Sequence, residues 1–527
     1  MNRRLATTAT LLLSAAGLFG GVGTATAAGG TAAPAQAPTS PTAPAAAACS
    51  GVRYANTSNT IYLNAAKDYT LSSIVAACPK IPLVQTDTAN KTWALNADLV
   101  LQNGARLSLR GSALGGDVNT LRLRSRASNA KTEVSAITVN GGTLNATGVT
   151  VTSWDDQAGK ADTKADYVTG ATQRGRAFVR AVSTRDAAGK THKSTLNIDR
   201  SVFTNLGYYA AESYGVAYKT RFCDRANPAA CGADAATGNQ TNSTFSNNYM
   251  GTYYWGTRNQ RFVGNKYVNN VMYGLNGHDA AVGITINRNI ASNNGNHGII
   301  CSQRCGNISI TENRVENNGL KPWTGPNPDA QGPAGQVHGI MLHRGLTNAV
   351  VANNVVNNHP NGSGIAIFDQ NAATISRNGI TGAKYGIRVS VGSTNNKFTG
   401  NRVSDSLTNA VFSFSGSDKA QYTNKSGRPS GNVFTGNTFS GVRAGSSSAL
   451  FKINDSDNFT FSGNTISNNA TPVVVTRSKG ITFTGNTFPA GQVFQLNGTA
   501  ASPTSVTISP SKGVKVQRDS NSTATLK

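Results

Sequence analysis

Apolar and polar residues alternate in short segments along most of the chain, and these segments recur at a regular interval. Segments such as 308–310 and 340–342 have the period of two that is typical of β-strands, and turns rich in Asn and Gly separate them. An Asn followed closely by an apolar residue marks each repeat, at Asn265, Asn289, Asn313, Asn354, Asn378, Asn401, Asn437, Asn464 and Asn486. Six of the eight intervals are 22 to 27 residues long, and the interval of 41 contains a Pro- and Gly-rich insert over residues 320–336.

A fixed period of this length, with two or three short strands in each repeat, predicts coils stacked on one another. The Asn that recurs at one phase predicts a ladder of side-chain amides that hydrogen-bond along the stack. We therefore expect an all-β protein, a right-handed parallel β-helix (solenoid) with a small N-terminal cap. A β-propeller is the alternative, but its blades need about 40 residues or more and carry different signatures.

The N-terminal 48 residues differ from the repeats. Residues 1–28 contain Arg3 and Arg4, then an apolar run, then Ala25-Thr-Ala27, which is typical of a secretory signal peptide. A membrane anchor is the alternative, but the apolar run is short and interrupted by Gly. Residues 29–48 are almost entirely Ala, Pro, Thr, Gly and Gln, as in a flexible linker. We therefore expect the mature protein to be secreted to the extracellular space.

The rest of the chain divides by its strand pattern. We expect a cap over residues 49–95, because a solenoid must cover its open end. The parallel β-helix is expected over 96–500, with the active-site coils at about 250–400, and a C-terminal tail over 501–527. No other apolar run is long enough for a transmembrane helix.

Six cysteines fall into three pairs that are close in sequence: Cys49 and Cys78, Cys223 and Cys231, and Cys301 and Cys305. An exported chain with an even number of cysteines is expected to form disulfides, although the sequence leaves their pairing open. The spacing of the third pair also suggests a metal site. Because no second Cys pair or suitable His pair lies nearby to complete four ligands, we expect a disulfide there and no metal.

Aligning the coils on a repeated Gly followed by Leu or Ile places chemically active residues on one stripe. The Gly residues are Gly274, Gly298, Gly339, Gly364 and Gly386. Four residues after the first four of them lie His278, Ser302, His343 and Phe368, and five residues after them lie Asp279, Gln303, Arg344 and Asp369. Arg304 and Arg388 lie at nearby offsets, and the preceding coil, less certainly aligned, adds Arg258 and Arg261. His297 and His338, each directly before the Gly, are expected to be turn residues.

The formal net charge of +24, with this row of Arg, favours a linear polyanion as the binding partner. A nucleic acid would be expected to meet interleaved aromatic residues or a known binding module, and neither is found. A uronate polymer carries one carboxylate on each sugar, and Arg binds carboxylates in a bidentate geometry. A solvated strip of paired Arg and Asp is the non-functional alternative for this stripe.

Several separated motifs resemble the mannuronan C5-epimerases of alginate biosynthesis. They are Tyr273-Gly-Leu-Asn-Gly-His-Asp279, Asn296-His-Gly-Ile-Ile300 with Arg304, and His338-Gly-Ile-Met-Leu-His-Arg344, with further likeness at 152–155, 174–178 and 206–215. The resemblance covers roughly residues 140–400. It implies an isomerase in which His278 is the catalytic base and Arg304 neutralises the substrate carboxylate.

The family motif Asp-Pro-His-Asp reads Asn276-Gly277-His278-Asp279 here, so its first two positions differ. We expect Asp279 to orient His278, which requires a turn between them because adjacent strand residues point to opposite faces. The other residues of the stripe are expected to bind substrate: Arg258, Arg261, His343, Arg344, Asp369 and Arg388.

Two alternatives to an epimerase stay open. A polyuronate lyase would use the same first step and then expel the 4-linked sugar, and a non-catalytic protein would only bind the polysaccharide. A glycoside hydrolase needs two suitably spaced carboxyl groups, and a calcium-dependent lyase needs a carboxylate cluster; the stripe offers neither. We expect a monomer that acts on an acidic polysaccharide without a cofactor, a nucleic acid or a membrane as partner.

Overall fold

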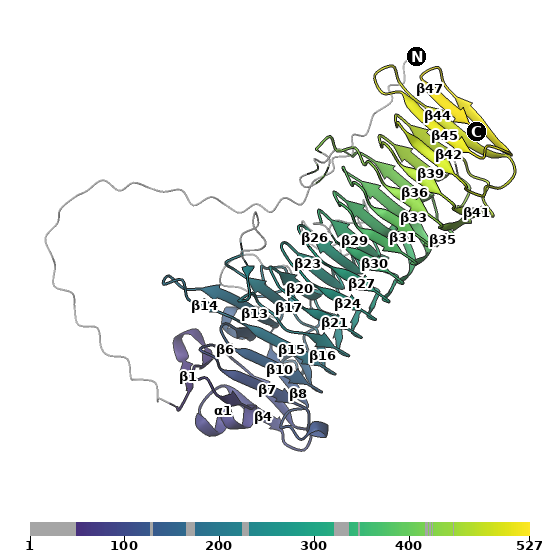
Figure 1. Ribbon diagram of the computed structural model, residues 1–527. Helices are drawn as coiled ribbons and strands as arrows, with labels where there is room; N and C mark the ends of the chain where they lie inside the picture. The colour runs from purple at the N-terminus through teal and green to yellow at the C-terminus, as the bar shows by residue number, and fades with distance from the viewer. Residues whose placement is uncertain are drawn as a thin grey trace, which may run out of the picture.

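Figure 1 shows the computed structural model, in which strands stack into an elongated solenoid that runs from a purple N-terminal end to yellow C-terminal coils. The structure describes residues 49–126, 130–164, 174–223, 231–320, 337–345, 348–416, 420, 423, 425–445 and 447–527. The expected signal peptide and linker, and the insert after residue 320, lie outside the described residues. The strands form one 31-stranded and one 16-stranded sheet, in which successive coils pair in parallel. The expected all-β class and parallel β-helix are confirmed.

Each coil contributes strands to three faces. The 31-stranded sheet contains two of them, because two long strands, β31 (Val355–Phe368) and β33 (Gly379–Ser390), bend from the second face into the first. The first face also contains β2 (Thr60–Leu63), β6 (Asp98–Leu101), β9 (Ala136–Val139), β13 (Phe178–Arg185), β17 (Gly215–Thr220), β20 (Met250–Trp255), β23 (Leu275–His278), β26 (Ile299–Ser302), β29 (Ile340–His343), β36 (Asn409–Phe414), β39 (Ala449–Asn454), β42 (Val473–Thr476), β44 (Gln492–Asn497) and β46 (Val514–Arg518).

The second face contains β4 (Leu83–Asp87), β5 (Thr92–Leu95), β8 (Thr120–Arg124), β11 (Thr150–Asp155), β16 (Val202–Thr204), β19 (Thr244–Ser246), β22 (Lys266–Val268), β25 (Ile290–Ser292), β28 (Arg314–Glu316), β35 (Arg402–Ser404), β38 (Thr438–Ser440) and β41 (Thr465–Ser467). Beside these faces, β1 (Val52–Ala55), β12 (Lys160–Ala161) and β14 (Thr191–His192) pair antiparallel with strands of the coils, and β4 pairs antiparallel with β5.

The third face is the 16-stranded sheet. It contains β3 (Asp68–Tyr69), β7 (Arg106–Arg110), β10 (Thr143–Thr147), β15 (Thr195–Asp199), β18 (Gln240–Thr241), β21 (Arg261–Val263), β24 (Thr285–Asn287), β27 (Ser309–Thr311), β30 (Val350–Ala352), β32 (Thr374–Ser376), β34 (Lys397–Thr399), β37 (Val433–Thr435), β40 (Thr460–Ser462), β43 (Ile481–Thr484), β45 (Thr504–Ser509) and β47 (Ser522–Leu526). Its inward side chains join those of the other faces in one continuous apolar core.

The Asn residue of each repeat lies in the turn before a second-face strand and is buried. The backbone N–H of Asn289 donates to Oδ1 of Asn313 at 2.9 Å, and Nδ2 of Asn289 donates to the same oxygen at 3.0 Å. The same pattern links Asn313 to Asn354 and continues along the stack to Asn486. The predicted amide ladder is therefore confirmed, and it fixes the register of the coils.

The two ends of the solenoid differ in how they are finished. At the N-terminal end α1 (Leu71–Ala77) buries Leu71 and Ile74 against the first coils. A disulfide links Cys49, before β1, to Cys78 at the C-terminal end of α1. At the C-terminal end β45, β46 and β47 pair with preceding strands, so residues 501–527 form the last coil rather than a separate tail.

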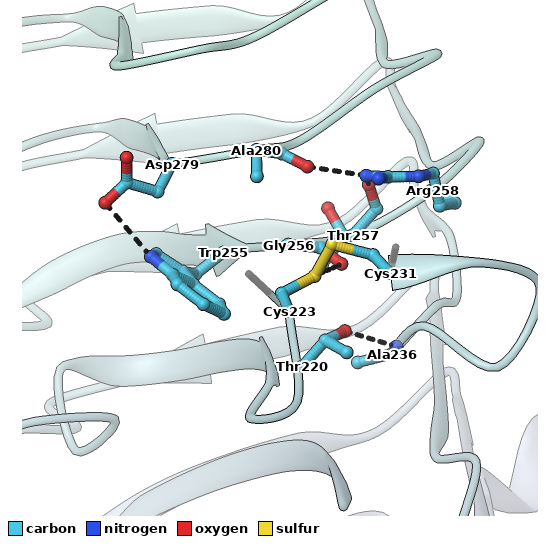
Figure 2. Close-up of a disulfide and its surroundings, with 10 residues drawn as sticks. All are labelled: Thr220, Cys223, Cys231, Ala236, Trp255, Gly256, Thr257, Arg258, Asp279 and Ala280. Atoms are coloured by element: carbon cyan, nitrogen blue, oxygen red, sulfur yellow. Dashed lines mark hydrogen bonds between the residues drawn. A yellow bond between two sulfur atoms is a disulfide. The ribbon is translucent and has the colours of Figure 1, made fainter. Parts of the chain in front are cut away.

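All six cysteines are paired as their spacing suggested. Cys223–Cys231 lies beside the turn that follows β20 (Figure 2), and Cys301–Cys305 encloses the turn that follows β26. The second and third disulfides therefore flank the coils where the sequence predicts the active site. Among the described residues, no helix has the length and apolar character needed to cross a bilayer.

Candidate active site

The predicted stripe lies at the ends of successive first-face strands. Trp255, His278, Ser302, His343 and Phe368 are consecutive partners in the parallel register from β20 to β31. The column therefore matches the alignment made on the Gly residues and extends it by one coil at Trp255. Strand neighbours are about 4.8 Å apart, so His278 and His343 are separated by two such steps.

Asp279 reaches His278 because the strand ends between them. Asp279 has φ 33°, in the left-handed region, and the equivalent Gln303, Arg344 and Asp369 have φ values of 65°, 52° and 50°. In this conformation the alternation of a strand no longer applies, so neighbouring side chains can meet. Oδ2 of Asp279 lies 3.3 Å from Nδ1 of His278. The turn that the sequence required between the two residues is present.

The Asp279 carboxylate is fully buried and holds three side chains. Besides His278, it contacts Nε1 of Trp255 at 3.3 Å (Figure 2) and Nη2 of Arg304 from the next coil. Burial alone would raise the pKa of Asp279, but the contacts to His278 and Arg304 outweigh it and lower the pKa to about 2. Asp279 is therefore an anion at any pH at which the protein is expected to work.

His278 is the member of this cluster that faces solvent, with 32% of its side chain exposed. Its ring lies beside the ring of Tyr253, with 6.0 Å between centroids. Because Nδ1 faces an ionised carboxylate, the proton of the neutral ring is favoured on Nδ1 and the lone pair on Nε2. The arrangement presents Nε2 of His278 as a base on the outer side of the first face.

His343 lies two coils away from His278, and burial disfavours a charge on its ring. Its Nδ1 lies 3.3 Å from Oγ of Ser302, and its ring is 4.6 Å from the ring of Phe368. Burial lowers the pKa of His343 to about 3, and the neighbouring charge of Arg344 contributes. His343 is therefore a neutral ring near pH 7, which can donate or accept a hydrogen bond but does not act as an imidazolium acid.

Two of the predicted substrate-binding arginines lie on the first-face side of the solenoid. Arg344 is 5% exposed, and its guanidinium carbon lies 5.6 Å from the ring centroid of Phe368. Arg388 lies one column over, as the strand partner of Ala366 and Phe412, with its guanidinium carbon 4.8 Å from the ring centroid of Phe414. Burial lowers the pKa of Arg388 to about 10.

Three other predicted residues are engaged elsewhere. Asp369 is buried, and its Oδ1 accepts hydrogen bonds from the backbone N–H of Thr423 at 3.0 Å and from Oγ1 at 2.6 Å. Nη1 of Arg258 donates to the carbonyls of Thr257 and Ala280 at 2.9 and 2.5 Å, beside the Cys223–Cys231 disulfide (Figure 2). Arg261 is exposed on β21 of the third face. The structure does not bring these three together with His278.

Sequence reasoning missed Trp255 and Lys219, which continue the column toward the N-terminus. They are strand partners, and Nζ of Lys219 lies 4.4 Å from the Trp255 ring centroid. The phrase used for alignment is absent from their coils, where Gly251 precedes Thr252 rather than Leu or Ile. Counting one period back from His278 would have found Trp255.

His297 and His338 lie in the turn segments directly before β26 and β29. Both are at least 95% buried, and their rings stack 5.2 Å apart, with Tyr273 on the other side of His297 at 5.4 Å. Nδ1 of His297 accepts the backbone N–H of His338 at 2.8 Å, and Nδ1 of His338 accepts that of Ser363 at 2.9 Å. These rings thus form a short ladder beside the stripe.

Comparisons with known proteins agree with this architecture. A mannuronan C5-epimerase of Pseudomonas syringae pv. tomato is 29% identical over 167 residues, and the mannuronan C5-epimerase AlgG of Azotobacter vinelandii is 27% identical over 176 residues. Each match covers 31% of this chain, and the matched segments span 28% and 33% of the two relatives. The crystal structure of the periplasmic alginate epimerase AlgG is similar with a TM-score of 0.58 and 19% identity, over 80% of this chain and 85% of that one. That likeness supports the fold.

A family model described as a periplasmic copper-binding protein (NosD) matches residues 330–445, less than a quarter of the chain. Within the described ranges there is no group of three or more His, Cys, Asp or Glu side chains placed to hold a metal ion. The match covers coils that carry the Asn ladder at Asn354, Asn378, Asn401 and Asn437.

Proposed function

We propose that this chain is a secreted polyuronate C5-epimerase that converts mannuronate residues into guluronate residues within an alginate-like polymer. The observation that carries the proposal is the solvent-facing His278 beside the buried Asp279, which is itself held by Arg304. The two matched relatives are named mannuronan C5-epimerases. The sequence motif that resembles that family contains His278 and Asp279.

Inverting C5 begins with removal of a proton next to a carboxylate, and that step is unfavourable because charge moves into an already anionic group. The enzyme must offset the carboxylate charge before the proton leaves. Arg304 supplies this charge in the proposal, since its guanidinium pairs with Asp279 and comes from the coil next to that of His278. A guanidinium binds a carboxylate in a planar, bidentate geometry. The buried Asp279 fixes where that guanidinium lies.

His278 takes the C5 proton on Nε2 in the proposed reaction. The Asp279 carboxylate holds the ring in one orientation and stabilises the imidazolium that forms. Because the pKa of Asp279 is about 2, the carboxylate stays charged and does not accept the proton itself. Reprotonation comes from the opposite side of the sugar, from water or from a neutral side-chain donor, because His343 with a pKa of about 3 is not an imidazolium.

The test is incubation of the mature protein with polymannuronate in D₂O, followed by proton NMR and by ultraviolet absorbance. New guluronate signals that carry deuterium at C5, without an unsaturated product, support the epimerase. An unsaturated product instead identifies a lyase with the same first step. Absence of both on every uronan tried, with binding retained, identifies a binding protein and overturns the proposal.

The role of His278 is tested by His278→Gln, with His192→Gln as the matched control. His192 lies on the β14 hairpin, where Nε2 contacts Asp186 at 3.2 Å, away from the stripe. Loss of a general base typically costs about 10² to 10⁴ in rate. We expect turnover to fall by at least that factor in His278→Gln, with polymer binding retained, and to be unchanged in the control. Equal activity of both variants would remove His278 from the reaction.

A further inference from the structure

Arg388 is a buried cation to which no described residue gives a counter-ion. It is 9% exposed, and no hydrogen bond or ion pair joins its guanidinium to any residue that the structure describes. Burying a charged group without a partner is costly, so such groups are normally paired. It lies over the face of Phe414, with 4.8 Å between the guanidinium carbon and the ring centroid. A cation kept in this state is suited to an anion that arrives from outside.

His338 offers a second donor without an acceptor. Its Nδ1 accepts the backbone N–H of Ser363, so the proton of the neutral ring is on Nε2. Nε2 is buried and has no hydrogen-bond partner within the described part of the chain. Burial lowers the pKa of His338 well below its ordinary value, and the nearby charges of His297 and Arg388 lower it further. The ring therefore remains neutral and keeps its N–H as a donor.

Ser363 provides a third group of this kind. It is fully buried, and its Oγ has no hydrogen-bond partner among the described residues. Ser363 lies in β31, is bonded to His338 through its own backbone N–H, and is the strand partner of Tyr385 on the strand that carries Arg388. Three unpartnered polar groups thus come from three successive coils, and each can donate a hydrogen bond.

We propose that Arg388, His338 and Ser363 form a carboxylate-binding subsite for a uronate residue several sugars away from the one that reacts at His278. This inference rests on the proposed function, because it takes the same polymer as ligand. A carboxylate accepts several hydrogen bonds at once and matches the guanidinium fork. Phe414, beside the guanidinium, adds an apolar surface for a sugar ring.

The subsite sets a minimum length for an efficient substrate. The strand of Arg388 is four parallel steps from that of His278, through β26, β29 and β31. Four steps correspond to about 19 Å along the solenoid axis. An oligomer shorter than this cannot reach both places, whereas a longer chain held at Arg388 is aligned along the stripe before its reacting sugar meets His278.

Arg388→Met tests the subsite, because it keeps much of the length of the side chain and removes the charge and the planar N–H donors of the guanidinium. We expect KM for long oligomannuronates to rise about tenfold or more, as for loss of a charge-assisted hydrogen bond, with little change in kcat. For oligomers shorter than about 19 Å, kcat/KM should be unchanged. Arg388→Lys keeps the charge and should recover part of the lost affinity. The matched control is Arg402→Met, at an exposed arginine of β35.

A stability measurement separates binding from a structural role. Removing an unpaired buried charge should leave the thermal midpoint of Arg388→Met unchanged or higher, whereas removing a structural residue should lower it. Binding of polymannuronate to each variant is measured directly, so the subsite is tested even if no turnover is found. The proposal is overturned if Arg388→Met binds long polymer as tightly as the native protein, or if short and long oligomers lose kcat/KM equally.

Discussion

At the scale of single residues, the candidate centre depends on one buried carboxylate that organises its neighbours. Asp279 contacts Trp255 from the preceding coil, His278 beside it and Arg304 from the following coil. A fully buried anion is unfavourable alone, and these cationic or polar partners offset this cost. The same contacts orient His278 and Arg304, so one side chain fixes both the base and the group that offsets substrate charge.

Replacing Asp279 should therefore reduce turnover without removing the base. In Asp279→Asn the amide cannot stabilise an imidazolium, so we expect kcat to fall at least about 10²-fold, within the range of general acid–base effects. Polymer binding should be retained, because His278 and the arginines of the stripe are unchanged in this variant. An unchanged kcat would show that Asp279 does not act on His278.

The same substitution should change the pH dependence of stability. The pKa of Asp279 is lowered to about 2 in the folded protein, against about 3.9 in an unfolded chain. Its contribution to stability is therefore complete above about pH 4 and is lost as pH falls toward 2. Thermal midpoints of native protein and Asp279→Asn should differ at pH 6 and converge as pH falls through this window. A constant difference across the window would contradict the assignment.

At the scale of elements, the repeat period fixes which residues can meet. Equal spacing of 24 residues between Asn265, Asn289 and Asn313 places His278 next to Ser302, and the amide ladder holds that register. The fold and the column from His278 to Phe368 could therefore be predicted from the sequence. The contact between Asp279 and Arg304 could not, because it depends on the left-handed turns at both residues. The alignment of Arg258 is less certain because its coil lacks the Gly-Ile phrase, and its guanidinium bonds backbone carbonyls.

A break in the amide ladder should loosen the coils that carry the site. Asn313→Ala removes hydrogen bonds to the carbonyl of Ile286 and to Asn354, and it removes the acceptor of Asn289. Leaving buried groups unpaired typically costs about 1 to 3 kcal/mol each, so unfolding free energy should fall by at least about 2 kcal/mol. Asn197→Ala on β15 removes two hydrogen bonds that are part-buried or exposed, one to Asn145 and one from the backbone N–H of Asn239, and should cost less. Denaturant unfolding measures both, and equal losses would contradict the special role of the ladder.

At the scale of the whole molecule, the proposed function brings a long positive solenoid together with a long negative polymer. The chain carries a formal net charge of +24. Each coil adds one side chain to a given column, and the columns run along the axis of the solenoid. Charge of this kind attracts many polyanions over distances of about 10 Å at moderate salt. Selectivity must then come from buried groups at fixed positions, such as Arg304 and Arg388, whose interactions salt screens much less.

The difference between long-range attraction and the contacts of buried groups predicts how salt changes turnover. Raising the salt concentration should increase KM for polymannuronate steeply, because salt screens the long-range attraction. At saturating polymer kcat should stay nearly constant, because salt has little effect on the buried contacts between Asp279, His278 and Arg304. A polyanion without uronate carboxylates, such as polyphosphate, should compete at low salt and lose its effect at physiological salt. Steady-state rates over a salt series, with and without this competitor, measure both effects. If kcat falls together with the affinity for polymer, the reacting groups themselves depend on surface charge that salt screens. That result would contradict the prediction that the whole molecule attracts the polymer while the buried cluster performs the chemistry independently of salt.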